Sequence, residues 1–178
     1  MLYFFLFEVL VGLKVLSVSS PTNLNPTSAP TPTILLSRID VLSIKKEYKV
    51  GEVVPISILV NTAGRKTDGT DLILYFDNRI LEATNGAIKK GLVYGEYPVT
   101  EVDSKNGVIK ISGVSKIGQD GFSGSGILAN LSLIARGVGK TVLKVDYTAG
   151  RTTDSNVVET KSAKDTLGQV NNLDLTRV

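Results

Sequence analysis

Two acidic residues on one predicted strand, Glu101 and Asp103, come nearest to a catalytic pair in this sequence. Residues two positions apart on a strand point to the same face, and one carboxylic acid with one carboxylate suffices to hydrolyse a glycosidic bond. Asp71 and Asp77 are further acids in this region. Acids on strands commonly do no more than solvate an exposed face, so we expect no catalysis from them.

The side chains that most enzymes use near neutral pH are missing from the chain. Its 178 residues include no histidine and no cysteine, which excludes Ser-His-Asp and thiol catalysis, disulfides and Cys-ligated zinc. The net charge is +3, with Lys and Arg scattered among Asp and Glu, whereas a nucleic-acid interface needs clustered cations. We therefore expect a protein that is not an enzyme, needs no cofactor and binds no nucleic acid.

Two short segments resemble ligand-binding loops. Asp154-Ser155-Asn156 has the opening spacing of a calcium loop, but the later Gly and Glu of that loop are missing. A looser calcium site made of Asp154 and nearby carbonyl oxygens stays open. GFSGSG (121–126) leads into a predicted strand and not a helix, so we interpret it as a flexible turn and not a phosphate-binding loop.

Tyr94 and Tyr97, in GLVYGEYP, are the best candidates for contact with carbohydrate. Aromatic rings present flat apolar faces that can stack on sugars, but the chain has no Trp and only 6% aromatic residues. The sequence predicts that these two tyrosines are the best exposed pair. The alternative is that they are partly buried loop residues.

The N-terminal part of the chain differs in composition from the rest. Residues 1–18 are strongly apolar and are followed by small residues, which predicts a signal peptide or a short membrane anchor. Residues 19–33 are rich in Pro, Thr and Ser, which predicts an extended linker. We expect the remainder to be secreted or held at the cell surface, with contact to a membrane only through residues 1–18.

From Ile34 onward, apolar and polar residues alternate between recurring turn residues, and no window fits an amphipathic helix of three turns. About nine short strands predict an all-β fold over residues 34–178, an antiparallel β-sandwich with jelly-roll topology. Turns are predicted at Asp68-Gly69, Asn85-Gly86 and Asp120-Gly121. The predicted strands are 34–44, 53–60, 71–76, two around Asn106-Gly107 within 99–112, 127–135, 141–147, 157–159 and 170–178.

Two strands have the clearest alternation. In 71–76, the pattern predicts that Leu72, Leu74 and Phe76 point inward, with Asp71, Ile73 and Tyr75 on the opposite face. In 127–135, the inward residues are predicted to be Ile127, Ala129, Leu131, Leu133 and Ala135.

Four short motifs follow one another with characteristic spacing: Tyr48-Lys49-Val50-Gly51-Glu52, the run from Asp71 to Asp77 with Ile80-Leu81-Glu82, Gly124 to Leu131, and Gly137-Val138-Gly139. Together they resemble a cohesin domain, the receptor module that binds dockerins in cellulosome-type assemblies. The resemblance covers roughly residues 36–178. Asn78 stands where the family has a proline after Asp77, and Gly69 stands where dockerin-binding cohesins often carry a polar residue.

This resemblance implies a non-catalytic, exported and monomeric module that docks a dockerin-like protein on one sheet face, for surface attachment or extracellular complex assembly. Asp71 matches an acidic residue that cohesins use on that face, so Asp71, Ile73 and Tyr75 are the predicted partner-binding residues. The same superfamily contains cellulose-binding modules. A carbohydrate-binding module that acts in polysaccharide breakdown therefore stays open as the alternative.

Overall fold

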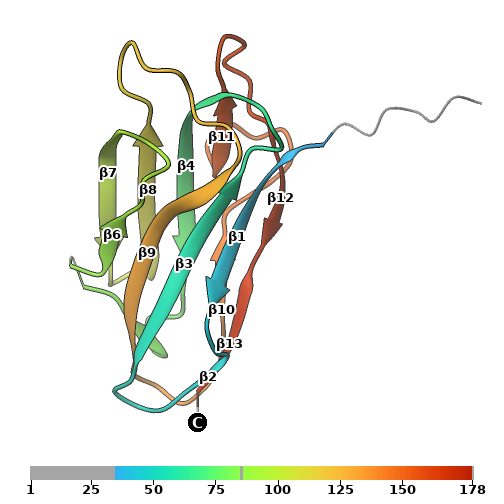
Figure 1. Cartoon of the computed structure of the whole chain (residues 1–178). Helices are drawn as coiled ribbons and strands as arrows, with labels where there is room; N and C mark the ends of the chain where they lie inside the picture. Colours follow the sequence, from blue (N-terminus) through green and yellow to red (C-terminus); the bar gives the residue numbers. More distant parts are fainter. Residues whose placement is uncertain (1–34, 85, 178) are drawn as a thin grey trace, which may run out of the picture. The chain divides into compact units, whose positions relative to one another are not determined.

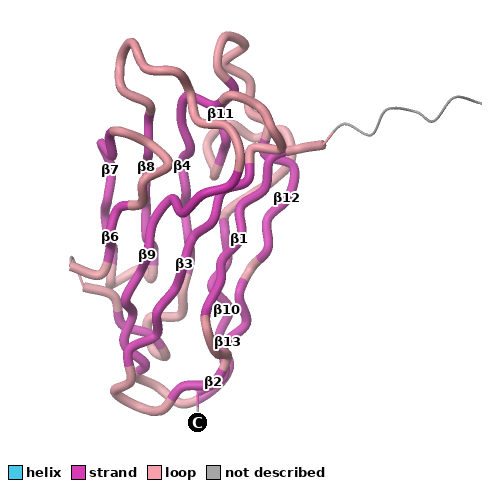
Figure 2. The backbone as a smooth tube through the Cα atoms, in the orientation of Figure 1, coloured by secondary structure: helices cyan, strands magenta, loops and turns pink. Residues whose placement is uncertain are grey.

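The computed structural model describes residues 35–84 and 86–177. The predicted signal peptide or anchor (1–18), the predicted linker (19–33) and Asn85 of one predicted turn lie outside the described residues. The described part consists of strands and loops (Figures 1 and 2). None of the described residues belongs to a helix long and apolar enough to cross a membrane.

The strands form two sheets. The six-stranded sheet consists of β1 (Ser37–Ser43), β3 (Val53–Asn61), β5 (Leu81–Glu82), β6 (Ile88–Lys90), β9 (Ser125–Ala135) and β12 (Leu167–Asn171). The seven-stranded sheet consists of β2 (Glu47–Tyr48), β4 (Thr67–Tyr75), β7 (Glu96–Asp103), β8 (Val108–Val114), β10 (Gly139–Val145), β11 (Asn156–Glu159) and β13 (Leu173–Arg177). The predicted all-β jelly-roll sandwich is thus confirmed, with short strands that the sequence did not indicate.

The core lies between the two sheets and is built by alternation along their strands. Leu72 and Leu74 of β4 are buried beside Ile109 and Ile111 of β8, and Leu131 of β9 is buried on the facing sheet. Each such side chain contributes about 1.5–3 kcal/mol when it leaves water. Since the inward positions are apolar, the intervening positions of β4 must face outward.

Two strand pairs run parallel, whereas the sequence predicted an antiparallel sandwich. β1 pairs with β12, and β13 pairs with β2, in parallel orientation. The predicted strand 170–178 is split between β12 and β13, which belong to different sheets. Asn172 lies between them, and its Oδ1 accepts a hydrogen bond from the backbone N–H of Val145 at 2.9 Å.

Two local predictions are wrong. Ile127 is 41% exposed, because a bulge in β9 places Ala129 opposite Ile58 but Ile127 opposite Leu59, so that the extra residue Leu128 takes the inward position. Asp68-Gly69 lies within β4 and not in a turn, because β11 and β8 pair with this part of the strand.

Candidate functional site

The predicted partner-binding residues occupy one face of β4. Asp71 is exposed, Ile73 is partly buried and Tyr75 is 41% exposed, whereas Leu72 and Leu74 between them are buried. Strand alternation therefore brings Asp71, Ile73 and Tyr75 together on the outer face of the seven-stranded sheet, in the orientation that the sequence pattern predicts.

Strand register continues this surface across β8 and β7, since directly opposed residues share a sheet face. Ile73 lies opposite Lys110, which lies opposite Glu101. The neighbouring rows are Tyr75 with Val108 and Asp103, and Asp71 with Ser112 and Val99. We call this surface the β4–β8–β7 face; it consists of Asp71, Ile73, Tyr75, Val99, Glu101, Asp103, Val108, Lys110 and Ser112.

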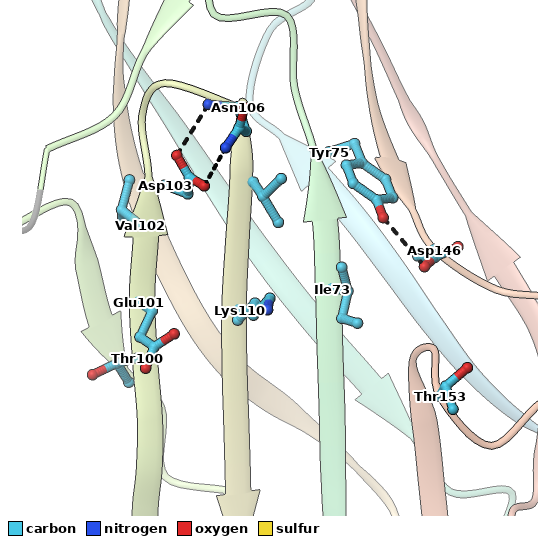
Figure 3. A pocket seen from close by; sticks show the side chains of 11 residues that line it. Ile73, Tyr75, Thr100, Glu101, Val102, Asp103, Asn106, Lys110, Asp146 and Thr153 are labelled. Atoms are coloured by element: carbon cyan, nitrogen blue, oxygen red, sulfur yellow. Dashed lines mark hydrogen bonds between the residues drawn. The ribbon is translucent and has the colours of Figure 1, made fainter.

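A groove of about 670 Å³ lies over the part of the β4–β8–β7 face that holds Ile73, Tyr75 and Lys110. Figure 3 shows Ile73 and Tyr75 on its floor, Glu101 on one side, and Asp146 and Thr153 on the other. Its floor mixes apolar side chains with charges of both signs, a composition that suits a docking surface. The wall that holds Asp146 and Thr153 was not predicted from the sequence, because neither residue belongs to a recognisable binding motif.

Loop 146–155 forms this wall, and β4 holds it at both ends. β10 and β11 pair with the same edge of β4, at Tyr75–Leu74 and at Asp71–Thr67 respectively, and the loop leaves the sheet between them. The backbone N–H of Asp146 donates to the carbonyl of Ile73 at 2.8 Å. The Tyr75 hydroxyl donates to Asp146 Oδ2 at 3.4 Å. These hydrogen bonds to Ile73 and Tyr75 hold the wall of the groove against β4.

The β7–β8 hairpin closes one end of the groove. Asp103 accepts hydrogen bonds from the backbone nitrogen of Asn106 at 3.0 Å and from its Nδ2 at 2.7 Å (Figure 3). These bonds lower the pKa of Asp103, the Asn106 side chain first. A carboxylic acid that donates a proton near neutral pH needs a raised pKa. Asp103, with its lowered pKa, is instead suited to holding the β7–β8 turn and to carrying a negative charge beside Glu101.

The prediction that Tyr94 and Tyr97 are an exposed pair is wrong for Tyr94, which is buried. Its hydroxyl lies 2.9 Å from both Thr67 Oγ1 and Thr70 Oγ1, and burial raises its pKa. Tyr97 is half-buried and its hydroxyl donates to the carbonyl of Leu128 at 2.9 Å. The two rings therefore face the protein interior, because polar partners from distant strands satisfy their hydroxyls there.

Within residues 35–84 and 86–177, no group of three or more Asp, Glu, His or Cys side chains is placed to hold a metal ion. Asp154, which the sequence left open as part of a calcium site, is buried at the base of loop 146–155.

Neither a protein-family model nor a curated protein matches this chain. Solved structures do. A non-cellulosomal cohesin from the hyperthermophilic archaeon Archaeoglobus fulgidus matches with a TM-score of 0.62 at 16% identity, over 81% of this chain and 92% of that chain. The seventh ScaB type I cohesin from Pseudobacteroides cellulosolvens matches with a TM-score of 0.63 at 18% identity, over 80% and 92%.

A third similar structure contains a partner. The third cohesin ScaC of Acetivibrio cellulolyticus, in complex with the ScaB dockerin, matches with a TM-score of 0.63 at 13% identity, over 80% of this chain and 99% of that chain. These similarities show that the chain has a cohesin-like fold, as the four sequence motifs imply.

Proposed function

We propose that this chain is a non-catalytic docking module that holds a dockerin-like protein on the β4–β8–β7 face. The observation that carries the proposal is the outward row of Asp71, Ile73 and Tyr75 within a cohesin-like fold. Ile73 and Tyr75 line the groove, and Asp71 lines a smaller hollow beside it. The ScaC cohesin of similar fold was solved with a dockerin bound.

The chemistry of the face supports protein docking. Ile73, Tyr75 and Val108 line the groove and offer partly exposed apolar surface, which a docked protein would shield from water. Glu101 and Asp103 on β7 are exposed acids that would orient a partner with basic groups. A paired sheet loses little conformational entropy when it binds.

The N-terminal segments suggest where docking would take place. An apolar segment at 1–18 and a Pro/Thr/Ser-rich stretch at 19–33 suit export followed by display at a distance from a surface. We propose that the module is secreted or anchored at the cell surface, where it assembles an extracellular complex.

The burial of Tyr94 argues against the carbohydrate-binding alternative, because it removes half of the predicted aromatic pair. Protein capture from the producing cell's secreted fraction, run beside an affinity gel containing polysaccharide, separates the two functions. We expect recovery of proteins that carry a dockerin-like module and no retardation in the gel. Retardation without protein capture would contradict docking. Glycosidase, esterase or protease turnover that disappears in Glu101→Gln or Asp103→Asn would contradict a non-catalytic role.

A further inference from the structure

A second, smaller hollow lies between β4 and the base of loop 146–155. It has a volume of about 250 Å³, and its polar lining includes Asp71, Thr152, Thr153, Asp154 and Asn156. All five residues carry side-chain oxygen atoms. The hollow is therefore a place where oxygen ligands gather from a strand and a loop.

Asp154 is the unusual residue of this hollow. It is 3% exposed, and its Oδ2 accepts a hydrogen bond from the backbone N–H of Thr148 at 2.6 Å. Its Oδ1 is buried without a hydrogen-bond partner. No Lys or Arg of residues 35–84 and 86–177 forms an ion pair with it. Since an uncompensated buried carboxylate is costly, this oxygen needs a positive partner or a donor.

A second oxygen in the same hollow has the same property. Oδ1 of Asn156 is buried and has no hydrogen-bond partner. Asn156 lies directly opposite Asp71 across β11 and β4, a position that brings two side chains of one sheet face close together. Asp71 is exposed and completes the set from the open side of the hollow. Buried polar atoms are rarely left unsatisfied, so these two oxygens call for a cation or a hydrogen-bond donor in the hollow.

We propose that Asp154, Asn156 and Asp71 bind a calcium ion in this hollow. Calcium takes six to eight oxygen ligands in flexible geometry, and the carboxylates, the amide oxygen, Thr152, Thr153 and water suit that demand. Magnesium fits less well, because it requires near-ideal octahedral geometry and gives up water reluctantly.

The charge of the site sets its strength. Only two carboxylates contribute, and Lys110 also lines the hollow and repels a cation. Affinity rises with ligand charge and rigidity, so we expect the range of extracellular modules, a dissociation constant of about 10⁻⁴–10⁻³ M. The ion would tie loop 146–155 to β4. All of its ligands belong to this chain, so calcium binding requires no docked partner, although Asp71 also lies on the β4–β8–β7 face.

The test is calorimetric titration of the whole chain with CaCl₂ after treatment with EDTA, beside the same titration with MgCl₂. We expect one saturable calcium site and weaker binding of magnesium. Asp154→Asn should weaken calcium binding by about tenfold or more, and Asp71→Asn by about threefold or more, because each removes a ligand charge. Calcium should raise the thermal unfolding midpoint of the wild type and leave that of Asp154→Asn unchanged.

Asp120→Asn is the matched control, since Asp120 is an exposed acid with an 89% exposed side chain. It should bind calcium as the wild type does. The proposal is overturned if the wild type takes up no calcium at about 10 mM, well above the expected range. It is also overturned if Asp120→Asn loses as much affinity as Asp154→Asn. Should Asp154→Asn fail to fold, unchanged binding by Asp71→Asn, whose side chain is exposed, overturns the three-residue site.

Discussion

Ser155 Oγ lies 2.9 Å from the backbone nitrogen of Ile73 and accepts its hydrogen bond. The same hydroxyl lies 3.4 Å from the carbonyl oxygen of Ile73. This contact occurs where the edge of β4 passes from β10 to β11 as its partner. Between β10 and β11 no strand of the described residues pairs with this edge of β4. The buried Ser155 hydroxyl takes the hydrogen bond of Ile73 there and holds loop 146–155 beside the floor of the groove.

We therefore expect Ser155→Ala to lower the free energy of unfolding by about 1–3 kcal/mol, because it leaves the N–H of Ile73 without an acceptor. Chemical denaturation measures this loss. Ser132→Ala is the matched control: Ser132 is exposed on β9, so its removal should change stability by no more than about 0.5 kcal/mol. Equal effects of the two substitutions would show that Ser155 does not hold the edge of β4.

We expect the β7–β8 turn to require glycine at position 107. Gly107 has a φ of 67°, and a Cβ there would lie 2.1 Å from the carbonyl oxygen of Phe76. Gly64 has a φ of 80° but no atom within 4 Å of such a Cβ. Gly64→Ala should cost about 1–2 kcal/mol for its left-handed backbone.

Gly107→Ala should cost at least about 2 kcal/mol more than Gly64→Ala, since a backbone clash adds to the same strain. Thermal or chemical unfolding of the two variants gives the difference. Similar stabilities would mean that the β7–β8 turn can shift away from Phe76 at little cost.

Asp77 gives a prediction for acidic pH. Hydrogen bonds from the Arg79 side chain and then its backbone lower the pKa of Asp77 from 3.8 to about 2. A depressed pKa in the folded state stabilises the fold above the ordinary value, so this contribution should be complete above pH 3.8 and lost as pH falls from there toward about 2.

Carboxyl NMR titration tests this shift directly. Arg79→Ala should move the midpoint of Asp77 upward, toward 3.8. Arg136→Ala removes the partner of Glu82 and should leave Asp77 unchanged. A midpoint near 3.8 in the wild type would contradict the Asp77–Arg79 pairing.

The sequence predicted the features that depend on local patterns. Alternation between Asp71 and Phe76 gave the correct faces of β4, because one side of this strand meets the core along its whole length. The Asn106-Gly107 turn was also predicted correctly, since a left-handed glycine is a local requirement.

Features set by distant residues were not predictable in this way. Tyr94 is buried because its hydroxyl forms hydrogen bonds with Thr67 and Thr70 of β4, which are distant in the sequence. Ile127 faces outward because of a bulge whose position depends on pairing with β3. The groove wall arises because β10 and β11 meet the same edge of β4, which no short pattern encodes.

Docking of a protein partner on the β4–β8–β7 face is tested most directly by measuring partner capture by variants with substitutions on that face. Asp71→Ala and Tyr75→Ala should each weaken capture of the dockerin-like partner by about 1 kcal/mol or more. In EDTA, where no calcium is bound at Asp71, Asp71→Ala should keep the free energy of unfolding within about 0.5 kcal/mol, because its side chain is exposed. The matched controls are Asp174→Ala, an exposed acid on β13, and Ile134→Ala, which is 37% exposed on the other sheet. We predict that both controls capture the partner as the wild type does. Wild-type capture by Asp71→Ala and Tyr75→Ala, with losses in Ile134→Ala, would contradict the account and move the interface to the six-stranded sheet.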